Sequence, residues 1–221
     1  MDLYDKITEK VNMIREKNIR PVSTEVAKIA NSLYRELPKD DSEFINICNG
    51  LVITDEWIPY QVMTIWIKRR KSAYDMHFFD TYERWLFEHT KCWGACDQYC
   101  YRVLNPMMEK FPLLYDKAFE WAGSEKTYVK RAAAVCFIQS TKSFVINVPF
   151  EIVKKISDLL MQDSHIHVQK GVGWLLKYAY LTYPQQVEDY LRENVKNMSR
   201  TTFRYALEKM DEDLRENLMR L

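Results

Sequence analysis

Three stretches of the sequence follow one pattern: EKTYVKRAAAVCF (residues 125–137), HIHVQKGVGWLLKY (residues 165–178) and SRTTFRYALEKM (residues 199–210). Each begins with polar residues, reaches a basic residue (Arg131, Lys170 or Arg204), and then becomes small and apolar. The basic residues are 39 and 34 positions apart, close to the length of two helices and their turns. Self-similarity at such a period predicts stacked helix pairs.

Two upstream stretches, PYQVMTIWIKRR (residues 59–70) and WGACDQYCYRVL (residues 93–104), fall at comparable spacing. About five helix pairs are therefore expected to stack into a curved solenoid of HEAT-like repeats. An irregular helical bundle has the same periodicity within each helix, but the shared order of basic and then small residues favours the solenoid.

The composition agrees with an all-α fold. Only 5 Gly and 7 Pro occur in 221 residues, and the long stretches between them are rich in residues that favour helix. We expect about a dozen helices in one HEAT-like repeat domain spanning 1–221, with divergent N-terminal helices in 1–53 and motif-bearing repeats in 54–221.

Local signals mark where individual helices begin or are disturbed. Pro149, Pro184 and Ser199 lie where helix starts are expected, because a helix start tolerates proline and is capped by serine. Pro106 lies inside a helical stretch and is expected to kink or split it. Gly171 and Gly173 lie within another helix, which predicts close approach of a neighbouring helix.

Charge and cysteine content limit the partners and the compartment. Lys and Arg number 32 and Asp and Glu 31, so any DNA-binding surface is expected to be a local patch. Five cysteines, an odd number, favour free thiols in a reducing cytoplasm. No apolar run of about 18 residues predicts a membrane span, and no heptad seam predicts an oligomer, so we expect a cytoplasmic monomer.

Four segments then point to a known family. CWGACD (residues 92–97), YVKRAAAV (128–135), VQKGVGWLLKYAY (168–180) and MSRTTFRYALEKM (198–210) resemble, in order and at appropriate separations, the signature segments of AlkD-type DNA alkylation repair proteins. The resemblance covers residues from about 80 to 215. It implies a helical solenoid whose concave face holds duplex DNA containing an alkylated purine.

The resemblance also implies roles for individual residues. Trp93, Asp97 and Trp174 match the two tryptophans and the carboxylate that approach the sugar of the damaged nucleotide, and Arg131 matches a basic residue near them. Trp93 and Asp97 are four positions apart and so share one helix face. Backbone phosphates would be contacted by a set of basic residues: Arg131, Lys130, Lys170, Lys177, Arg200 and Arg204.

The implied chemistry is that of a monofunctional DNA glycosylase in base excision repair. A purine alkylated at N3 or N7 is cationic and leaves without a general acid, so the site must stabilise an oxocarbenium-like sugar and place a water molecule. Asp97 can do both, and the faces of Trp93 and Trp174 attract positive charge. No metal and no cofactor is required, and the family does not rotate the base out of the helix.

Other residues have simpler interpretations. Taken singly, Trp57, Trp66, Trp85 and Trp121 are expected in the core. Cys92, Cys96 and Cys100 repeat every four residues, but metal sites draw on loops and a fourth ligand, so buried thiols beside Trp93 are the preferred interpretation. The chain has no phosphate-binding Gly-rich loop, nucleophile elbow or HExxH motif.

The chain departs from the family near its N-terminus. Where active members usually have Gly, Pro and then Arg leading into a DNA-contacting helix, it reads SLYRELPKDDSEFINI (residues 32–47), which is acidic and lacks Gly; Gly94 also follows Trp93 where the family often has an acidic residue. The KRRK run at 68–71 is interpreted as an exposed helix end that could touch phosphate. Two hypotheses follow: a glycosylase, or a non-catalytic paralogue that binds DNA weakly or serves as a protein-interaction module.

Overall fold

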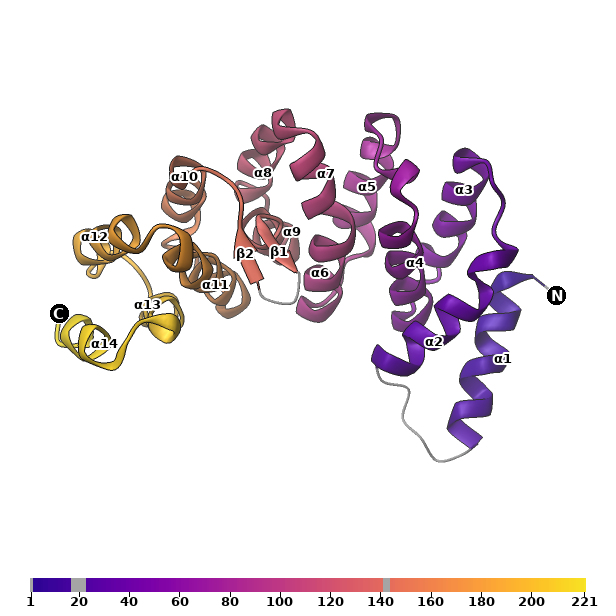
Figure 1. The fold of residues 1–221 in the computed structure, drawn as a ribbon, viewed down its shortest axis with the longest axis horizontal. Coiled ribbons are helices and arrows are strands. Elements are labelled where there is room, and N and C mark those ends of the chain that lie inside the picture. Colours follow the sequence, from indigo (N-terminus) through magenta and orange to yellow (C-terminus); the bar gives the residue numbers. More distant parts are fainter. Residues whose placement is uncertain (1, 17–22, 141–143) are drawn as a thin grey trace. The chain divides into compact units, whose positions relative to one another are not determined.

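A computed structural model describes residues 2–16, 23–140 and 144–221, and the chain divides into two compact units, Met1–His89 and Thr90–Leu221. Both units are helical, as the composition predicts (Figure 1). In these described ranges, no helix combines the length and apolar character that a bilayer crossing requires.

The first unit contains five α-helices and three short 3-10 turns in its described residues. The helices are α1 (Leu3–Glu16), α2 (Ser23–Leu33), α3 (Asp41–Val52), α4 (Trp57–Arg69) and α5 (Phe79–His89), and the turns span Tyr34–Glu36, Lys71–Ala73 and Met76–Phe78. Helix α4 packs against both α2 and α3, and α1 packs against α2. The unit is thus built from neighbouring helices that follow each other in the chain.

Tryptophan side chains fill the core of the first unit and form hydrogen bonds within it. Trp66 and Trp85 are fully buried, and their indole N–H groups donate to the Ala30 carbonyl at 2.8 Å and to Asn49 Oδ1 at 2.9 Å. Trp121, in the second unit, is buried as well. The prediction is wrong for Trp57, which is 42% exposed because it begins α4, before the helix enters the core.

The second unit repeats helix pairs more regularly. Its elements are α6 (Trp93–Tyr99), a π-helical turn (Cys100–Leu104), α7 (Asn105–Lys110), a 3-10 turn (Pro112–Leu114), α8 (Tyr115–Ala122), α9 (Thr127–Val135), β1 (Ile138–Ser140), β2 (Phe144–Ile146), α10 (Phe150–Leu160), α11 (Ile166–Thr182), α12 (Pro184–Asn194), α13 (Arg200–Ala206), a 3-10 turn (Leu207–Lys209) and α14 (Glu212–Met219).

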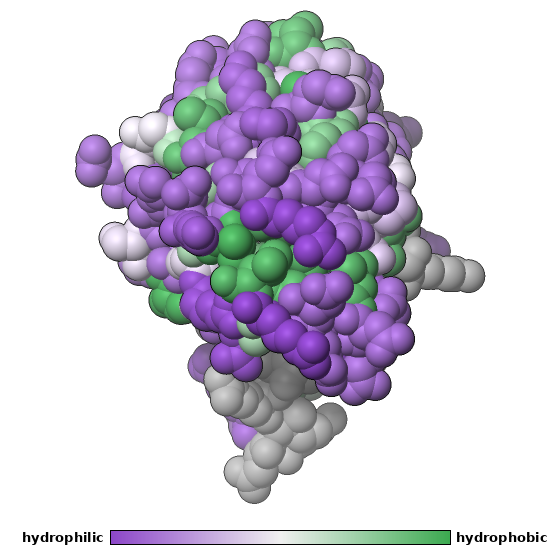
Figure 2. All heavy atoms as spheres, turned by 90° about the vertical axis from the view of Figure 1, so that its left-hand side faces the viewer, coloured by the Kyte–Doolittle hydropathy of each residue, from purple (hydrophilic) through white to green (hydrophobic). Residues whose placement is uncertain are grey.

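One layer of this unit carries the repeated sequence pattern. Helix α9 packs against α6, α11 packs against α9, and α13 packs against α11, while α8 and α10 pack on each other and on this layer. The three patterned stretches therefore form successive neighbours, as HEAT-like repeats require. At the C-terminal end of the unit, an apolar area remains at the surface between strongly hydrophilic side chains (Figure 2).

Helix starts follow the predicted chemistry. Ser199 caps α13 by accepting a hydrogen bond from the Thr202 amide at 3.1 Å, and Pro184 is the first residue of α12. Before Pro106, the backbone widens into the π-helical turn and then resumes as α7. Proline has no N–H for the helical ladder, so the disturbance expected there takes the form of a π bulge.

A short β-hairpin departs from the purely helical prediction. Strands β1 and β2 pair antiparallel with Ile138 opposite Ile146, between helices α9 and α10. The residues Phe144, Val145 and Ile146 are β-branched or aromatic, which suits a half-buried strand. The hairpin packs against α11 and so becomes part of the surroundings of the site described below.

Gly173 allows α11 and α13 to approach closely. A Cβ atom at this position would lie 2.5 Å from Tyr205 Cβ and 2.7 Å from the Thr202 carbonyl oxygen. The close approach expected from the paired glycines is therefore confirmed, and backbone atoms of α13 leave no room for a methyl group.

Gly173→Ala is expected to lower the free energy of unfolding by about 1–3 kcal/mol, because it overpacks this contact despite the higher helix propensity of alanine. Urea denaturation measures the change. Gly50→Ala is the matched control, since Gly50 lies in α3 and a Cβ there meets no atom within 4 Å. Equal effects of the two substitutions would show that the α11–α13 contact does not depend on glycine.

Candidate active site

A buried ion pair lies at the centre of the second unit. Asp97, on α6, and Arg131, on α9, are 5% and 4% exposed. Arg131 donates from Nε to Asp97 Oδ1 at 2.8 Å and from NH2 to Oδ2 at 2.9 Å. This is a bidentate guanidinium–carboxylate pair. Its two parallel hydrogen bonds best offset the desolvation free energy of burying two charges.

The same guanidinium reaches a third helix. Arg131 NH1 donates to the His167 carbonyl oxygen at 2.5 Å, in the first turn of α11. Gly171, one turn further along α11, lies against the arginine stem, because a Cβ there would be 3.4 Å from Arg131 Cγ. Arg131 thus joins α6, α9 and α11 around the Asp97 carboxylate.

Burial and pairing act in opposite directions on the two charged groups. Burial raises the pKa of Asp97, and the hydrogen bonds and positive charge of Arg131 oppose that rise. Burial disfavours charge on Arg131, but the hydrogen bonds and negative charge of Asp97 outweigh it and raise the pKa of Arg131. The contacts within the pair are therefore what favours the ionised form of each group against its burial.

Aromatic rings flank the pair on two sides. Trp93 begins α6, is 55% exposed, and stacks on His167 with ring centroids 6.4 Å apart and planes at 25°. Burial, followed by the nearby Arg131 charge, lowers the pKa of His167, so this ring is neutral at pH 7. An exposed tryptophan on a neutral ring presents a large aromatic face to a ligand.

Trp174 is held by a cluster of other aromatic rings. Its ring lies 5.4 Å from Phe144 of the hairpin and 5.8 Å from Tyr101, both edge to face, and 5.9 Å from the Arg131 guanidinium carbon. Phe144 also lies 5.0 Å from Tyr178. The hairpin, which the sequence does not predict, therefore helps to fix the orientation of one predicted site residue.

These groups line a single hollow of about 440 Å³. The tryptophans, the ion pair and two lysines predicted from the sequence meet there, together with three further residues; the lining consists of Trp93, Asp97, Arg131, His167, Lys170, Trp174, Lys177, Tyr178 and Tyr205. The size suits a small group such as a nucleoside portion rather than a long chain. The structure thus brings the predicted constellation together in one cavity.

The predicted phosphate-binding residues are distributed unevenly. Lys170 and Lys177 line the hollow, where Lys177 pairs with Glu208 at 2.5 Å. Lys130 does not line it: its ammonium group pairs with Asp163. Arg200 lies over Phe203 and donates to the Met219 carbonyl oxygen at 3.1 Å, also outside this hollow.

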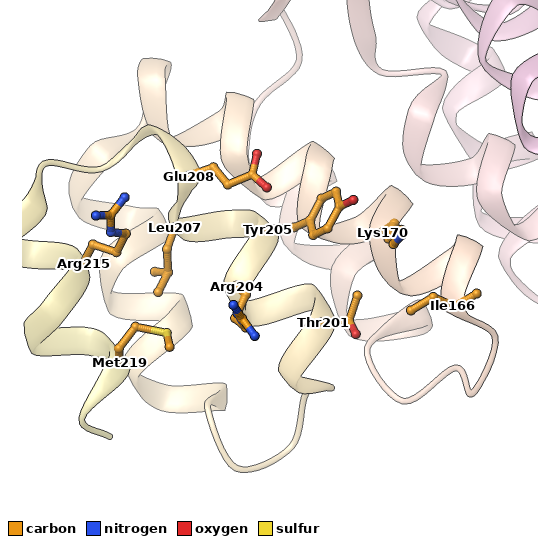
Figure 3. Close-up of a pocket in the computed structure, with 9 residues that line it drawn as sticks. All are labelled: Ile166, Lys170, Thr201, Arg204, Tyr205, Leu207, Glu208, Arg215 and Met219. Atoms are coloured by element: carbon orange, nitrogen blue, oxygen red, sulfur yellow. The ribbon is translucent and has the colours of Figure 1, made fainter.

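Arg204 lines a second hollow that adjoins the first. Figure 3 shows this cavity of about 510 Å³, with Ile166 and Lys170 coming from α11 and Arg215 and Met219 from α14. Lys170 and Tyr205 line both cavities, so the two adjoin at these side chains. Arg204 therefore lies beside the candidate site rather than within it.

The sequence prediction missed His167, Tyr178 and Tyr205. A usable signal for His167 was present, because it precedes Trp174 by two helical turns and shares a face with Lys170 and Lys177. Its spacing from His165, two positions along one helix start, does not predict joint metal ligation. Among the residues that the structure describes, no group of three or more His, Cys, Asp or Glu side chains forms a metal site.

The cysteines of α6 pack as separate thiols. Cys96 Sγ lies 3.3 Å from the Tyr128 carbonyl oxygen and Cys100 Sγ 4.0 Å from that of Ala132, both against α9. Cys92 is exposed instead, because it caps α6 by accepting a hydrogen bond from the Ala95 amide. Buried thiols are therefore confirmed for two of the three positions.

The fold and the site together define a class of protein. It consists of stacked helix pairs, and its cavity contains a buried carboxylate between two tryptophans. A family model described as "DNA alkylation repair enzyme" matches residues 21–210, and the chain belongs to this family. The fold is similar to that of a structure described as "Predicted DNA alkylation repair enzyme from Enterococcus faecalis", with a TM-score of 0.74, 14% identity, and coverage of 94% of this chain and 96% of that one. No curated protein sequence matches the chain.

Arg131→Met is expected to destabilise the protein by about 3–5 kcal/mol at neutral pH, because it leaves the Asp97 carboxylate buried without its partner. The folded state then binds the Asp97 proton more tightly than the unfolded state does. Stability is therefore lost as the pH rises through the raised pKa of Asp97, and the loss is smallest below the ordinary value of 3.8. Urea denaturation between pH 4 and 8 measures this dependence.

The double variant Arg131→Met with Asp97→Asn is the control, since it removes both charges. It is expected to recover most of the loss at neutral pH and to remove its pH dependence. A single-variant loss that is the same at every pH would show that Arg131 acts through packing rather than through the carboxylate.

Proposed function

We propose that the protein is a monofunctional DNA glycosylase that hydrolyses the N-glycosidic bond of cationic N3- and N7-alkylpurines in duplex DNA. The observation that carries the proposal is the Asp97 carboxylate, held by Arg131 at one wall of a cavity that Trp93 and Trp174 also line. Membership of the DNA alkylation repair family supports DNA as the substrate.

The arrangement suits a reaction whose leaving group is already activated. A cationic purine departs with the electrons of the glycosidic bond and becomes neutral, so no residue has to protonate it. Positive charge then develops on the sugar, and a preorganised carboxylate such as Asp97 lowers the energy of that state. The same carboxylate can accept a hydrogen bond from the water that attacks the sugar carbon.

The tryptophans favour the charged lesion over an undamaged base. Their faces carry negative electrostatic potential, and a cation over such a face gains about 0.5–2 kcal/mol depending on its desolvation. Trp93 offers an exposed face, whereas Trp174 is fixed by Phe144 and Tyr101. The Trp93 ring is therefore accessible and the Trp174 ring is rigid. Trp93 suits contact with the solvent side of a bound nucleotide, and Trp174 suits contact with its inner side.

Arg131 in this proposal positions Asp97. Its Nε and NH2 groups are committed to the carboxylate and its NH1 to the His167 carbonyl oxygen. Lys170, which lines the same cavity, is the better candidate for a phosphate beside the damaged nucleotide, whereas Lys177 is paired with Glu208.

A non-catalytic, weakly DNA-binding paralogue or protein-interaction module is the second candidate. The observation that favours it is the burial of Asp97, since both carboxylate oxygens already accept hydrogen bonds from Arg131. Each carboxylate oxygen has a second lone pair, however, and Asp97 still lines the cavity. The glycosylase is therefore preferred, and one assay separates the two.

Purified protein is expected to release 7-methylguanine from duplex DNA faster than the spontaneous rate, and Asp97→Asn is expected to lower that release about 100-fold, since it removes the negative charge with little change in shape. Chromatography of the freed base measures both rates, and circular dichroism checks that the variant is folded. Absence of release above background from the wild-type protein would favour the non-catalytic candidate.

Trp93→Ala is expected to lower the rate of base release by roughly 2- to 30-fold, the equivalent of one cation–π contact, with little loss of stability because the side chain is exposed. Trp57→Ala is a matched control, since Trp57 is also an exposed tryptophan at a helix start but lies in the first unit. Equal rates of base release for the two variants would show that Trp93 does not contribute to the reaction.

A further inference from the structure

We propose that a basic pocket in the first unit, at the C-terminal end of α4, binds the phosphate backbone of duplex DNA. The inference rests on the proposed function for its partner, duplex DNA, but concerns residues that take no part in the candidate active site. The pocket has a volume of about 520 Å³ and is lined by Tyr34, Leu37, Pro38, Lys39, Arg69, Arg70, Lys71 and Ser72. Half of these residues are cationic and none of them is acidic.

Two segments that are distant in sequence form this pocket. The first, Tyr34 to Lys39, belongs to the stretch that departs from the family pattern; the other, Arg69 to Ser72, contains most of the KRRK run. Neither segment indicates a DNA-binding site alone, because the stretch around Tyr34 to Lys39 is acidic in composition and the KRRK run has the composition of an ordinary helix end. The fold places their basic side chains around one hollow.

Arg70 fastens the two segments together. Its Nε donates to Asp41 Oδ1 at 2.6 Å, its NH1 donates to the Pro38 carbonyl oxygen at 2.6 Å, and its NH2 donates to the Lys39 carbonyl oxygen. The guanidinium carbon also lies 4.7 Å from the centre of the Phe44 ring. The charge of Arg70 is therefore used inside the protein, and its role is to hold the wall of the pocket in place.

The acidic residues in and beside the segment Tyr34 to Lys39 are engaged elsewhere. Glu36 pairs with Lys6, Asp40 caps α3 by accepting a hydrogen bond from the Glu43 amide at 2.9 Å, and Asp41 pairs with Arg70. Ser72 also donates to Asp41 at 2.9 Å. The charges of Glu36 and Asp41 are thus compensated by cations within the protein.

Three exposed cations remain for a ligand. In the ranges the structure describes, Lys39, Arg69 and Lys71 have no carboxylate partner. Arg69 is oriented by neutral groups only: its guanidinium carbon lies 4.2 Å from the centre of the Tyr34 ring, and NH1 donates to Asn31 Oδ1 at 2.9 Å. A guanidinium held over a ring keeps donors available for the forked contact that phosphate oxygens accept.

The shape of the pocket favours a polyanion. Its lining combines two lysines with two arginines, and its apolar members are Leu37 and Pro38 beside Tyr34. Such a surface offers several separate charges and no deep apolar slot, which suits successive phosphates of a duplex and conveys no sequence preference. Counterion release upon neutralising these phosphates would drive the binding and make it depend strongly on salt.

The test is the salt dependence of binding to an undamaged, fluorescently labelled duplex. The slope of log Kd against log salt falls by roughly 0.9 for each phosphate contact that is lost. The triple variant Lys39→Gln, Arg69→Gln and Lys71→Gln is therefore expected to lower the magnitude of the slope by about two to three. It is also expected to weaken binding equally for duplexes of different sequence.

The control variant carries Lys28→Gln, Lys117→Gln and Lys154→Gln, which removes the same total charge from exposed lysines that pair with Glu25, Glu120 and Asp158. It is expected to leave the slope close to that of the wild-type protein. If the triple variant and the control have the same slope, the proposal is overturned, whatever the base-release assay gives.

Two further measurements test this inference separately from the proposed function and distinguish duplex DNA from free phosphate as the ligand. Asp97→Asn is expected to lower base release about 100-fold and leave the salt slope unchanged, so failure of the proposed function and failure of this inference give different results. Inorganic phosphate, compared with chloride at equal ionic strength, is expected not to displace the duplex. Displacement by inorganic phosphate at millimolar concentration would assign the pocket to free phosphate and overturn the duplex assignment.

Discussion

The second unit depends on one buried contact, the bidentate pair between Arg131 and Asp97. Two charges at such low exposure are stable only when each is paired and hydrogen-bonded, and the pair meets this requirement with two N–H···O bonds from Arg131 and a third to the His167 carbonyl oxygen. Because these three groups lie on α6, α9 and α11, the contact fixes the register of three successive helices at the point where their side chains form the candidate site.

This constraint also determines the kind of chemistry that the cavity can support. A carboxylate paired with a guanidinium is a poor general acid, because the cation favours its ionised form. A fixed negative group can stabilise positive charge without reorganisation when a cationic sugar forms. Under the proposed glycosylase activity, the substrate brings its own activated leaving group, and a purine alkylated at N3 or N7 meets that condition.

The sequence predicted the helical repeats because helical periodicity and proline or serine at helix starts can be read within one or two helices. Trp93, Asp97, Arg131 and Trp174 were instead named from the resemblance to a family, and the fold brings their side chains to one cavity. The sequence did not predict that Phe144 would orient Trp174, because three-residue strands have almost no periodicity. Nor did it distinguish Lys177, which lines the cavity, from Lys130, which pairs with Asp163, because their difference lies in which helix face packs inward.

The balance of charge in this chain conceals its local distribution. The totals of 32 basic and 31 acidic residues leave no large overall positive field, yet two acids near the basic pocket of the first unit, Glu36 and Asp41, are paired with Lys6 and Arg70. In the second unit, the charge of Arg131 is likewise compensated by Asp97. A basic residue is available to DNA only if the fold leaves it without an acidic partner. In the described part of the first unit, Lys39, Arg69 and Lys71 meet this condition, which is why the proposed DNA contact lies beside the segment that departs from the family pattern.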